Sequence, residues 1–232
     1  MLTSRSLPRQ IVTGAVVLCL SVTTYSLLQY SGLLIPLRTG LIYVGVLVLT
    51  CLTDLLIVWR LTNSTDTEYL WIAHQSLKWG LLIAGFWLIE MVTGNLLDAR
   101  SGTVRTLYFG SSLLAFMLPL FAGIWGSRKS GRVRTGMLMG LWGGIVSGLL
   151  AFLILMTITY FFLNIMLRDP QNVLQFQGSG ARDLTTFVIA DSLAGATGHL
   201  VIGPVLGSGL GLVGGVIGKA LGAKPATNEN LP

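Results

Sequence analysis

The chain has 232 residues, 53% of them hydrophobic and only 10% charged, and apolar runs of about 20 residues recur along its whole length. This composition excludes a soluble globular protein and predicts a polytopic, all-helical membrane protein. The formal charge of +6 would favour a nucleic-acid partner in a soluble chain, but here the basic residues lie in short loops and near the termini. Membrane topology therefore accounts for the charge, and no nucleic-acid partner is expected.

The first apolar segment follows two basic residues, Arg5 and Arg9, and so resembles the start of a secretory signal peptide. A cleavable signal needs small residues at the cut, and no A-x-A pattern follows. Leu18, directly before Cys19, is also too bulky for a lipoprotein cleavage site. We therefore expect a retained first span. Cys19 and Cys51 both lie in apolar runs and are interpreted as small buried side chains, not as a disulfide or a metal site.

Six segments have the length and the composition of membrane spans. They cover residues 11–29, 34–59, 70–93, 107–125, 136–163 and 200–221. Polar and turn-forming residues separate them, and the longest break covers residues 164–183. All six spans are assigned to one transmembrane domain, residues 1–222, which is followed by a polar tail at residues 223–232.

Residues 184–203 are apolar enough to form a seventh span, with Asp183 as the cap of its helix. A seventh span would place the C-terminus on the outer side of the membrane, which the positive charges of Lys219 and Lys224 disfavour. The preferred interpretation is therefore a helix that lies at the outer surface or re-enters the membrane. A bend near Pro204 would then lead into the last span.

The distribution of Lys and Arg predicts the side of the membrane on which each loop lies. With six spans and a cytoplasmic N-terminus, nine basic residues face the cytoplasm and five face the opposite side, while Lys78 falls within a span. Four of the nine lie in the loop from Arg128 to Arg134, which contains no acidic residue. We therefore expect both termini in the cytoplasm and the protein in a cell membrane, the inner membrane of a bacterium. A second interpretation of the loop is a binding site for anionic lipid head groups.

Two series of glycines at helical spacing run through the last two spans. They are Gly136, Gly140, Gly144 and Gly148, then Gly203, Gly207, Gly211, Gly214, Gly218 and Gly222. So many glycines would weaken a soluble helix, whereas a membrane helix gains a flat face for close backbone approach. The two spans are antiparallel in the predicted topology, so the series lie at a similar depth. Three interpretations are packing of one series on the other, an interface with a second copy or partner subunit, and a surface that moves on gating.

Few ionisable residues lie within the predicted spans, and each is costly there unless it has a partner or water. Asp54 lies near the inner end of the second span, while His74 and Lys78 enter the third span from the same side, on one helix face. Because a short loop joins these spans, Asp54 is expected to meet His74 or Lys78. The two interpretations are a buried ion pair and a proton site that faces an inner cavity.

Three more ionisable residues lie towards the outer side of the predicted bundle. Glu90 is near the outer end of the third span, where Arg38, Arg100 or Arg105 would neutralise it. Asp191 and His199 are eight residues apart, with Gly195 between them, and continue the face of the second glycine series. About 12 Å separates them along a helix, which is too far for a catalytic contact without water or another residue. Cation binding, proton relay and hydrogen bonding to a neighbouring helix are the interpretations.

No enzyme motif is convincing. Residues 209–214 match G-x-G-x-x-G literally, but no strand precedes them and no acidic residue follows at the required distance. The chain has no Walker A sequence, no H-E-x-x-H, no G-x-S-x-G elbow and no paired-cysteine metal site. We therefore expect no enzymatic activity, no cofactor and no bound metal.

Two functional classes remain. In the first, which is preferred, the bundle translocates a small solute, an ion or a proton, and the candidate polar residues line an aqueous cavity. In the second, the protein is a non-catalytic structural or regulatory subunit, in which the glycine series make permanent contacts within a homo-oligomer or with another membrane subunit. The lipid bilayer is a partner in both.

Overall fold

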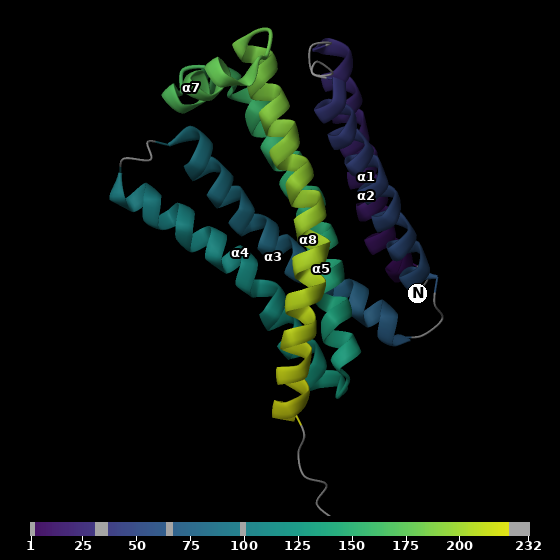
Figure 1. The fold of residues 1–232 in the computed structure, drawn as a ribbon. Coiled ribbons are helices and arrows are strands. Elements are labelled where there is room, and N and C mark those ends of the chain that lie inside the picture. The colour runs from purple at the N-terminus through teal and green to yellow at the C-terminus, as the bar shows by residue number, and fades with distance from the viewer. Residues whose placement is uncertain (1–2, 31–36, 64–66, 98–100, 223–232) are drawn as a thin grey trace, which may run out of the picture.

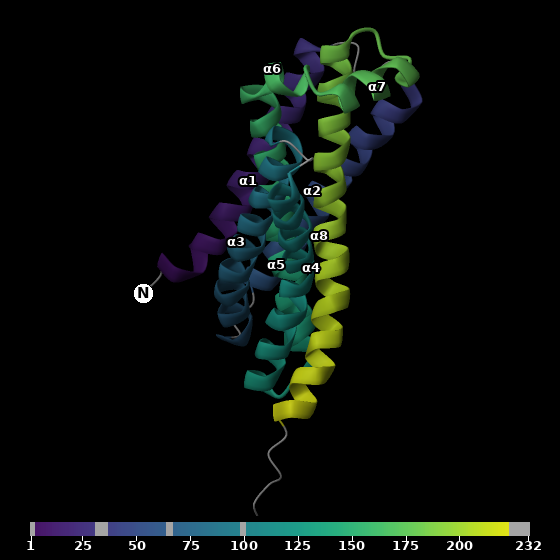
Figure 2. The same cartoon turned by 90° about the vertical axis from the view of Figure 1, so that its left-hand side faces the viewer.

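The computed structural model describes residues 3–30, 37–63, 67–97 and 101–222, and every regular element within these ranges is a helix (Figure 1 and Figure 2). The tail predicted at residues 223–232 lies outside this part of the chain. The helices of the described ranges are α1 (Thr3–Gln29), α2 (Leu37–Thr62), α3 (Thr67–Leu96), α4 (Gly102–Ser130), α5 (Val133–Phe161), α6 (Leu163–Met166), α7 (Pro170–Ser179) and α8 (Leu184–Gly222).

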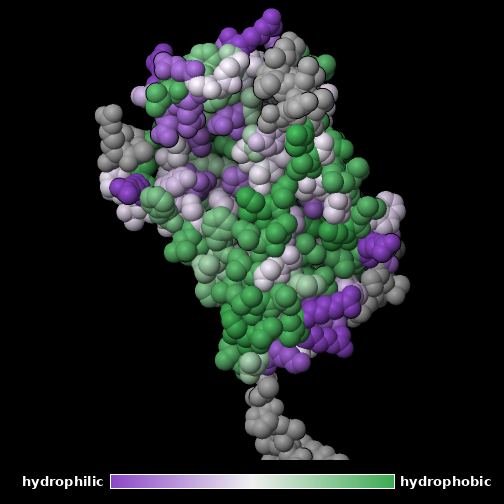
Figure 3. Space-filling view, in the orientation of Figure 1, coloured by the Kyte–Doolittle hydropathy of each residue, from purple (hydrophilic) through white to green (hydrophobic). Residues whose placement is uncertain are grey.

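Six of these helices, α1 to α5 and α8, are long and apolar enough to cross a membrane. The prediction of an all-helical bundle with six spans is therefore confirmed, and the protein is a multi-pass membrane protein. Large apolar side chains stay exposed on the outside of the bundle, for example Leu28, Phe121 and Val213. Figure 3 shows such residues as a broad apolar surface over the lower half of the molecule. The fatty-acid chains of the bilayer are the solvent that this surface requires.

Helix α5 is the core of the bundle. Other parts of the chain bury 72% of its membrane window, against at most 33% for the other five spans. Trp142 and Phe152, two of the largest side chains in the protein, are fully buried on this helix. Helices α1, α3, α4 and α8 all pack against it. The remaining helices are therefore positioned mainly by their contacts with α5.

Glycines allow α5 and α8 to pack backbone against backbone. A Cβ atom added to Gly144 would collide with the carbonyl oxygen of Gly203, and the converse holds for a Cβ atom on Gly203. Gly148, one turn further along α5, lies against the backbone of His199 in the same way. Side chains at these positions would hold the helices apart, so the glycines make dispersion contacts and weak Cα–H hydrogen bonds possible along the whole interface.

The glycine series of α8 divides between two neighbouring helices. Gly214 and Gly218 face α4, where added Cβ atoms would meet the carbonyl oxygens of Leu120 and Ile124. The face towards α5 continues instead through Gly215, which lies against the backbone of α5 at its first residue. At 100° per residue, a step of three residues in place of four turns the glycine face by about 100°. The spacing changes from four residues to three between Gly211 and Gly214, and the glycines of the series after this change face α4 instead of α5. The sequence analysis treated the whole series as one face.

Helices α3 and α4 lean away from α8 towards the end of the bundle that carries α7 (Figure 1). The close backbone contacts between α4 and α8 lie in the other half of α4, from Leu120 to Arg128. Pro119 is buried directly before this stretch. The α3–α4 hairpin is thus held against α8 at one end of the bundle and separated from it at the other.

Helices α1 and α2 form a second hairpin beside α5. Near the α7 end, the hydroxyl groups of Ser26 on α1 and Tyr160 on α5 share a hydrogen bond of 2.5 Å. Deeper in the bundle, the Sγ atom of Cys19 is 3.8 Å from the carbonyl oxygen of Leu149. Cys19 and Cys51 are both free and buried, as the interpretation of small buried side chains requires.

The structure contradicts a separate helix at residues 184–203. These residues continue through Pro204 without interruption, and α8 is one helix of 39 residues. Its length is about 58 Å at 1.5 Å per residue, almost twice the roughly 30 Å of the hydrocarbon core. One long span therefore accommodates the whole apolar run, so neither a seventh span nor a re-entrant turn forms. Contacts of Gly203 with Gly144, and of Gly207 with Gly140, hold α8 to α5 on both sides of Pro204.

The surface helix that precedes the last span is α7, inside the break predicted at residues 164–183. Asp169 caps this helix by accepting a hydrogen bond of 2.9 Å from the backbone N–H of Gln171, and Pro170 occupies the first turn. Gly180 ends the helix in the left-handed conformation, with φ of 69°. None of the residues of α7 is buried. The sequence analysis interpreted these residues as a loop, but Asp169 and Gly180 cap a short exposed helix between them.

Candidate functional site

A polar cavity lies where α3 and α4 diverge from α8, under α7. Its outer part has a volume of about 680 Å³ and its inner part about 170 Å³. The two parts share four lining residues, Glu90, Asn95, Asn172 and Asp191. A single water needs roughly 10–15 Å³ of such volume, so both parts have room for several waters. In Figure 3 the entrance is the hollow at the upper left, with polar side chains gathered around it.

Glu90 lies in the wall of the cavity on α3. Tyr108 of α4 is close enough for its hydroxyl group to interact with this carboxylate, across the two helices of the hairpin. Arg105, which the sequence suggested as a counter-ion, lines only the outer part of the cavity, and its guanidinium lies 5.8 Å from the centre of the Phe109 ring. No ion pair joins Arg105 to Glu90, both of which are described residues. Tyr108, and not Arg105, is therefore the residue of α4 that interacts with Glu90.

Asp191 and His199 reach the same cavity from α8. Asp191 lines both parts of the cavity and His199 lines the inner part. Both therefore lie on one face of the helix, as their spacing predicts. His199 is also close enough to Glu90 for an electrostatic interaction between the two side chains. The structure thus brings Glu90, Asp191 and His199, which the sequence placed on two different helices, into one site.

The ring of His199 is held by two contacts at the inner end of the cavity. Its Nδ1 atom is 2.8 Å from the carbonyl oxygen of Gly195, one turn earlier on α8. Its ring meets the ring of Trp87 edge to face, with 4.7 Å between the ring centres. Trp87 also lines a second cavity of about 20 Å³, whose other walls are mainly apolar side chains and glycines. The polar cavity therefore gives way to apolar packing at Trp87.

Sequence reasoning missed several cavity residues, among them Asn95, Tyr108 and Asn172. Asn95 follows Glu90 by little more than one helical turn, and an amide near the end of a membrane helix was a usable signal. Tyr108 carried no signal of its own, because tyrosine is common near span ends. Asn172 lies in α7, which was expected to be a loop, so nothing in its neighbourhood indicated that it would cover the cavity.

The predicted inner cluster is not assembled. The side chain of Asp54 is 2% exposed, and its Oδ2 atom has no hydrogen-bond partner. The Nδ1 atom of His74 is 2.9 Å from the carbonyl oxygen of Leu70 in its own helix, and Lys78 is exposed. No ion pair joins Asp54 to either residue, although the structure describes all three. Asp54 is therefore buried while Lys78 is exposed, and His74 is bonded within its own helix.

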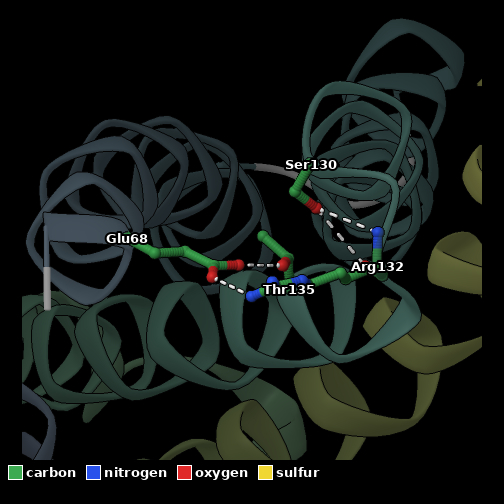
Figure 4. A network of polar contacts seen from close by, with 4 residues as sticks. All are labelled: Glu68, Ser130, Arg132 and Thr135. Atoms are coloured by element: carbon green, nitrogen blue, oxygen red, sulfur yellow. Dashed lines mark hydrogen bonds and ion pairs between the residues drawn. The ribbon is translucent and has the colours of Figure 1, made fainter.

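A polar network at the opposite end of the bundle ties α3 to the start of α5 (Figure 4). Glu68 accepts a hydrogen bond of 2.6 Å from the guanidinium of Arg132 and one of 2.8 Å from the hydroxyl of Thr135. Ser130 accepts a further hydrogen bond from the backbone N–H of Arg132. Lys129 of the same loop lies over the stacked rings of Trp71 and Trp125. These contacts fix the α4–α5 loop, and they are typical of a membrane–water boundary.

Asp183 stands directly before α8 and caps it. Its carboxylate accepts two hydrogen bonds of 2.8 Å, from the backbone N–H and from the hydroxyl of Thr186. The backbone N–H of Thr186 is the main reason why the pKa of Asp183 is lower than its usual value, and the hydroxyl of Thr186 and the charge of Arg182 act in the same direction. Asp183 is therefore a structural cap, as predicted, and it does not line the cavity.

The cavity combines three carboxylates, four amides, an imidazole, a phenol and a guanidinium at one end of a six-span bundle. Within the described residues, no three His, Cys, Asp or Glu side chains are grouped so that they could hold a metal ion. The arrangement can bind and orient a polar solute. Comparison of the chain with protein-family models, with curated proteins and with solved structures finds no match in any of the three.

Proposed function

We propose that the protein is a membrane carrier that binds a small polar solute at Glu90, Asp191 and His199 and moves it across the bilayer. One observation carries the proposal: three ionisable residues of membrane helices face a single cavity that has room for water. Such residues are costly inside a membrane and typically mark the path of a solute or a proton. Binding rather than chemistry is proposed, because about 12 Å of helix separates Asp191 from His199.

The cavity enters the bundle from one end and is replaced at Trp87 by apolar packing. A carrier is open to one side of the membrane at a time, whereas a channel needs a continuous polar path. The geometry supports a carrier whose cavity is open at the α7 end. It does not require a second entrance in the same conformation.

In this proposal the α7 end faces the outside, and both termini face the cytoplasm of the cell whose membrane holds the protein. At the other end of the bundle lie the described basic residues Arg9, Arg60, Arg128, Lys129, Arg132, Arg134 and Lys219. The described basic residues at the α7 end are Arg105, Arg168 and Arg182. The excess of positive charge supports a cytoplasmic position for the end opposite α7.

The α3–α4 hairpin is the part whose movement would close the cavity. The interaction between Tyr108 and Glu90 joins its two helices, so that they would move together. The hairpin meets α8 through glycines, for example where Gly218 lies on the backbone of Ile124. A contact without interlocking side chains allows small rotations between helices. A rocking movement about this contact would bring α4 towards α8 over the cavity.

Flux into vesicles that contain the purified protein tests the proposal. We expect uptake of a small polar solute down its gradient, and a decrease of at least tenfold in Asp191→Asn and in His199→Ala. Asp183→Asn is the matched control, because it makes the same change on the same chain segment outside the cavity and retains a capping side chain. Flux in this variant should equal that of the wild type.

The alternative function is a structural or regulatory subunit without transport activity. The same experiment separates the two functions. Absence of flux for cations, anions and neutral solutes, together with a stable complex between this protein and another membrane protein, would reject the carrier. The glycine faces described above are occupied within the chain by α4 and α5, so they do not by themselves require a second subunit.

A further inference from the structure

We infer that the cavity takes an organic cation that carries several N–H donors, such as a primary ammonium or a guanidinium group. The inference rests on the proposed binding role of the cavity and names the chemistry of its ligand. Several polar groups of the lining already donate hydrogen bonds to the protein, and their acceptor atoms remain available to a ligand.

His199 presents an acceptor to the cavity. Its Nδ1 atom is 2.8 Å from the carbonyl oxygen of Gly195, and a carbonyl oxygen can only accept a hydrogen bond. The proton of the neutral imidazole must therefore be on Nδ1. The Nε2 atom is then left without a proton, and its lone pair is available to a donor on the ligand.

Two of the four amides of the cavity, Asn95 and Asn172, follow the same pattern. The Nδ2 atom of Asn95 donates a hydrogen bond of 2.8 Å to the carbonyl oxygen of Met91, and that of Asn172 donates one of 2.8 Å to the carbonyl oxygen of Met166. These contacts fix the orientation of both amides, because an amide oxygen in the same place would face a carbonyl oxygen. Neither Oδ1 atom accepts a hydrogen bond from a described residue, so both oxygens remain available as acceptors.

The carboxylates add negative charge to these acceptors. Glu90 interacts with Tyr108 and His199, and an ionised carboxylate can accept about four hydrogen bonds. Asp191 makes no hydrogen bond or ion pair with any residue in the described part of the chain. A third carboxylate, Asp169, already caps α7 through Gln171. The lining therefore offers several vacant acceptor positions around Glu90 and Asp191.

The cationic side chain that lines the cavity is Arg105, in its outer part. It makes no ion pair with Glu90 or Asp191, all of them described residues, and it rests over the ring of Phe109. Arg105 thus neutralises neither carboxylate. A carboxylate in a membrane helix is stabilised by a cation, so the ligand supplies the missing charge.

Other ligand classes fit less well. An anion would meet two carboxylates and several acceptors, and would be repelled. A metal ion needs several oxygen or nitrogen ligands within about 2–2.6 Å, and the His, Cys, Asp and Glu side chains of the described residues are not grouped closely enough. An ammonium or guanidinium group directs N–H donors over a wider range of distances and directions than a metal ion accepts. This suits acceptors that are spread over a cavity of about 170 Å³.

Binding measurements with matched probes test this inference. The full-length protein in lipid nanodiscs is titrated by calorimetry with methylammonium, putrescine and guanidinium. Tetramethylammonium carries the same charge as methylammonium but no N–H donor, and acetate carries the opposite charge. We expect the N–H cations to bind at least tenfold more tightly than tetramethylammonium, and acetate not to bind.

Variants locate the binding site. Glu90→Gln and Asp191→Asn should each weaken binding of the N–H cations at least tenfold, while Asp183→Asn should leave it unchanged. The two cavity variants lie on different helices, so a folding defect in one leaves the other as a test. Glu90→Gln also retains an acceptor for Tyr108, so its fold should be preserved.

Three results would overturn the inference: equal binding of tetramethylammonium, binding of acetate, or no binding of any N–H cation. The inference and the carrier proposal fail separately. Binding of N–H cations without flux in vesicles would reject transport and leave the ligand class in place. Flux of an anion or a neutral solute, without binding of N–H cations, would reject the ligand class and leave transport in place.

Discussion

Gly140 of α5 and Gly207 of α8 lie so close that a Cβ atom added to either would collide with the carbonyl oxygen of the other. This reciprocal contact lies near the middle of the longest interface in the bundle. It shows that the two helices are held at backbone contact, and that the missing side chains are what allows it.

Substitution at this contact should destabilise the bundle. We expect Gly207→Ala to lower the free energy of unfolding by about 1–3 kcal/mol, because the new methyl group must push two rigid backbones apart. Gly209→Ala is the matched control on the same helix, since nothing lies within 4 Å of its added Cβ. It should be neutral or slightly stabilising, because alanine favours a helix more than glycine does. Unfolding in mixed micelles followed by circular dichroism measures both; equal stability of the two variants would contradict the packing described.

A cysteine in the cavity should be accessible to water. Gly195 lines the inner part of the cavity, and a Cβ atom there makes only an ordinary contact with Leu155, so Gly195→Cys should fold. A membrane-impermeant thiol reagent is expected to label it from outside intact cells. Gly209→Cys, on the exposed surface of α8, should remain unlabelled because lipid covers it. The native Cys19 and Cys51 are buried and should not react.

Labelling of Gly195→Cys only from the cytoplasmic side would reverse the proposed orientation. Failure to label from either side, in a variant that still folds, would show that water does not reach the inner part of the cavity.

Removal of the buried carboxyl group of Asp54 should stabilise the protein. The side chain is 2% exposed and its Oδ2 atom has no hydrogen-bond partner, so the group is desolvated without compensation. We expect Asp54→Leu, which has the same branched skeleton of four side-chain heavy atoms, to raise the free energy of unfolding by about 1–3 kcal/mol. The same unfolding experiment measures it. A loss of stability would mean that the carboxyl group has a partner in the membrane that the structure does not show.

The first turn of α8 should respond to acid through Asp183. Hydrogen bonds from Thr186 lower the pKa of this carboxyl group below its usual 3.8. A lowered pKa in the folded state stabilises the protein fully above pH 3.8, and the stabilisation is lost as the pH falls through the lowered value. Hydrogen exchange of the amides at residues 185–188 should therefore be constant from pH 7 to about pH 5, after correction for the intrinsic rate, and should accelerate below the lowered pKa.

Asp183→Asn provides the control for this prediction. Asparagine caps a helix about as well as aspartate but does not titrate in this range. The variant should therefore lose the acid response while it keeps the first turn. An unchanged acid response in Asp183→Asn would assign the response to another group.

The amino-acid sequence was sufficient for every property that depends on local periodicity. Hydropathy predicted six spans, and the spacing of Asp191 and His199 placed both on one face of a helix, as observed. Asp183 was identified as a cap from its position before an apolar run. These properties follow from the helical repeat and from the length of the hydrocarbon core, which are the same in any membrane protein.

The tertiary structure alone decided how each helix is rotated and what it meets. Asp54 turns away from Lys78, Glu90 joins Asp191 in one cavity, and the glycines of α8 serve both α5 and α4. In water a helix buries its apolar stripe, so the sequence reveals the inner face. In a bilayer, lipid solvates apolar side chains about as well as the protein interior does, and the inner face is selected by close packing between particular backbones. That packing involves residues far apart in the chain, so no local pattern contains it.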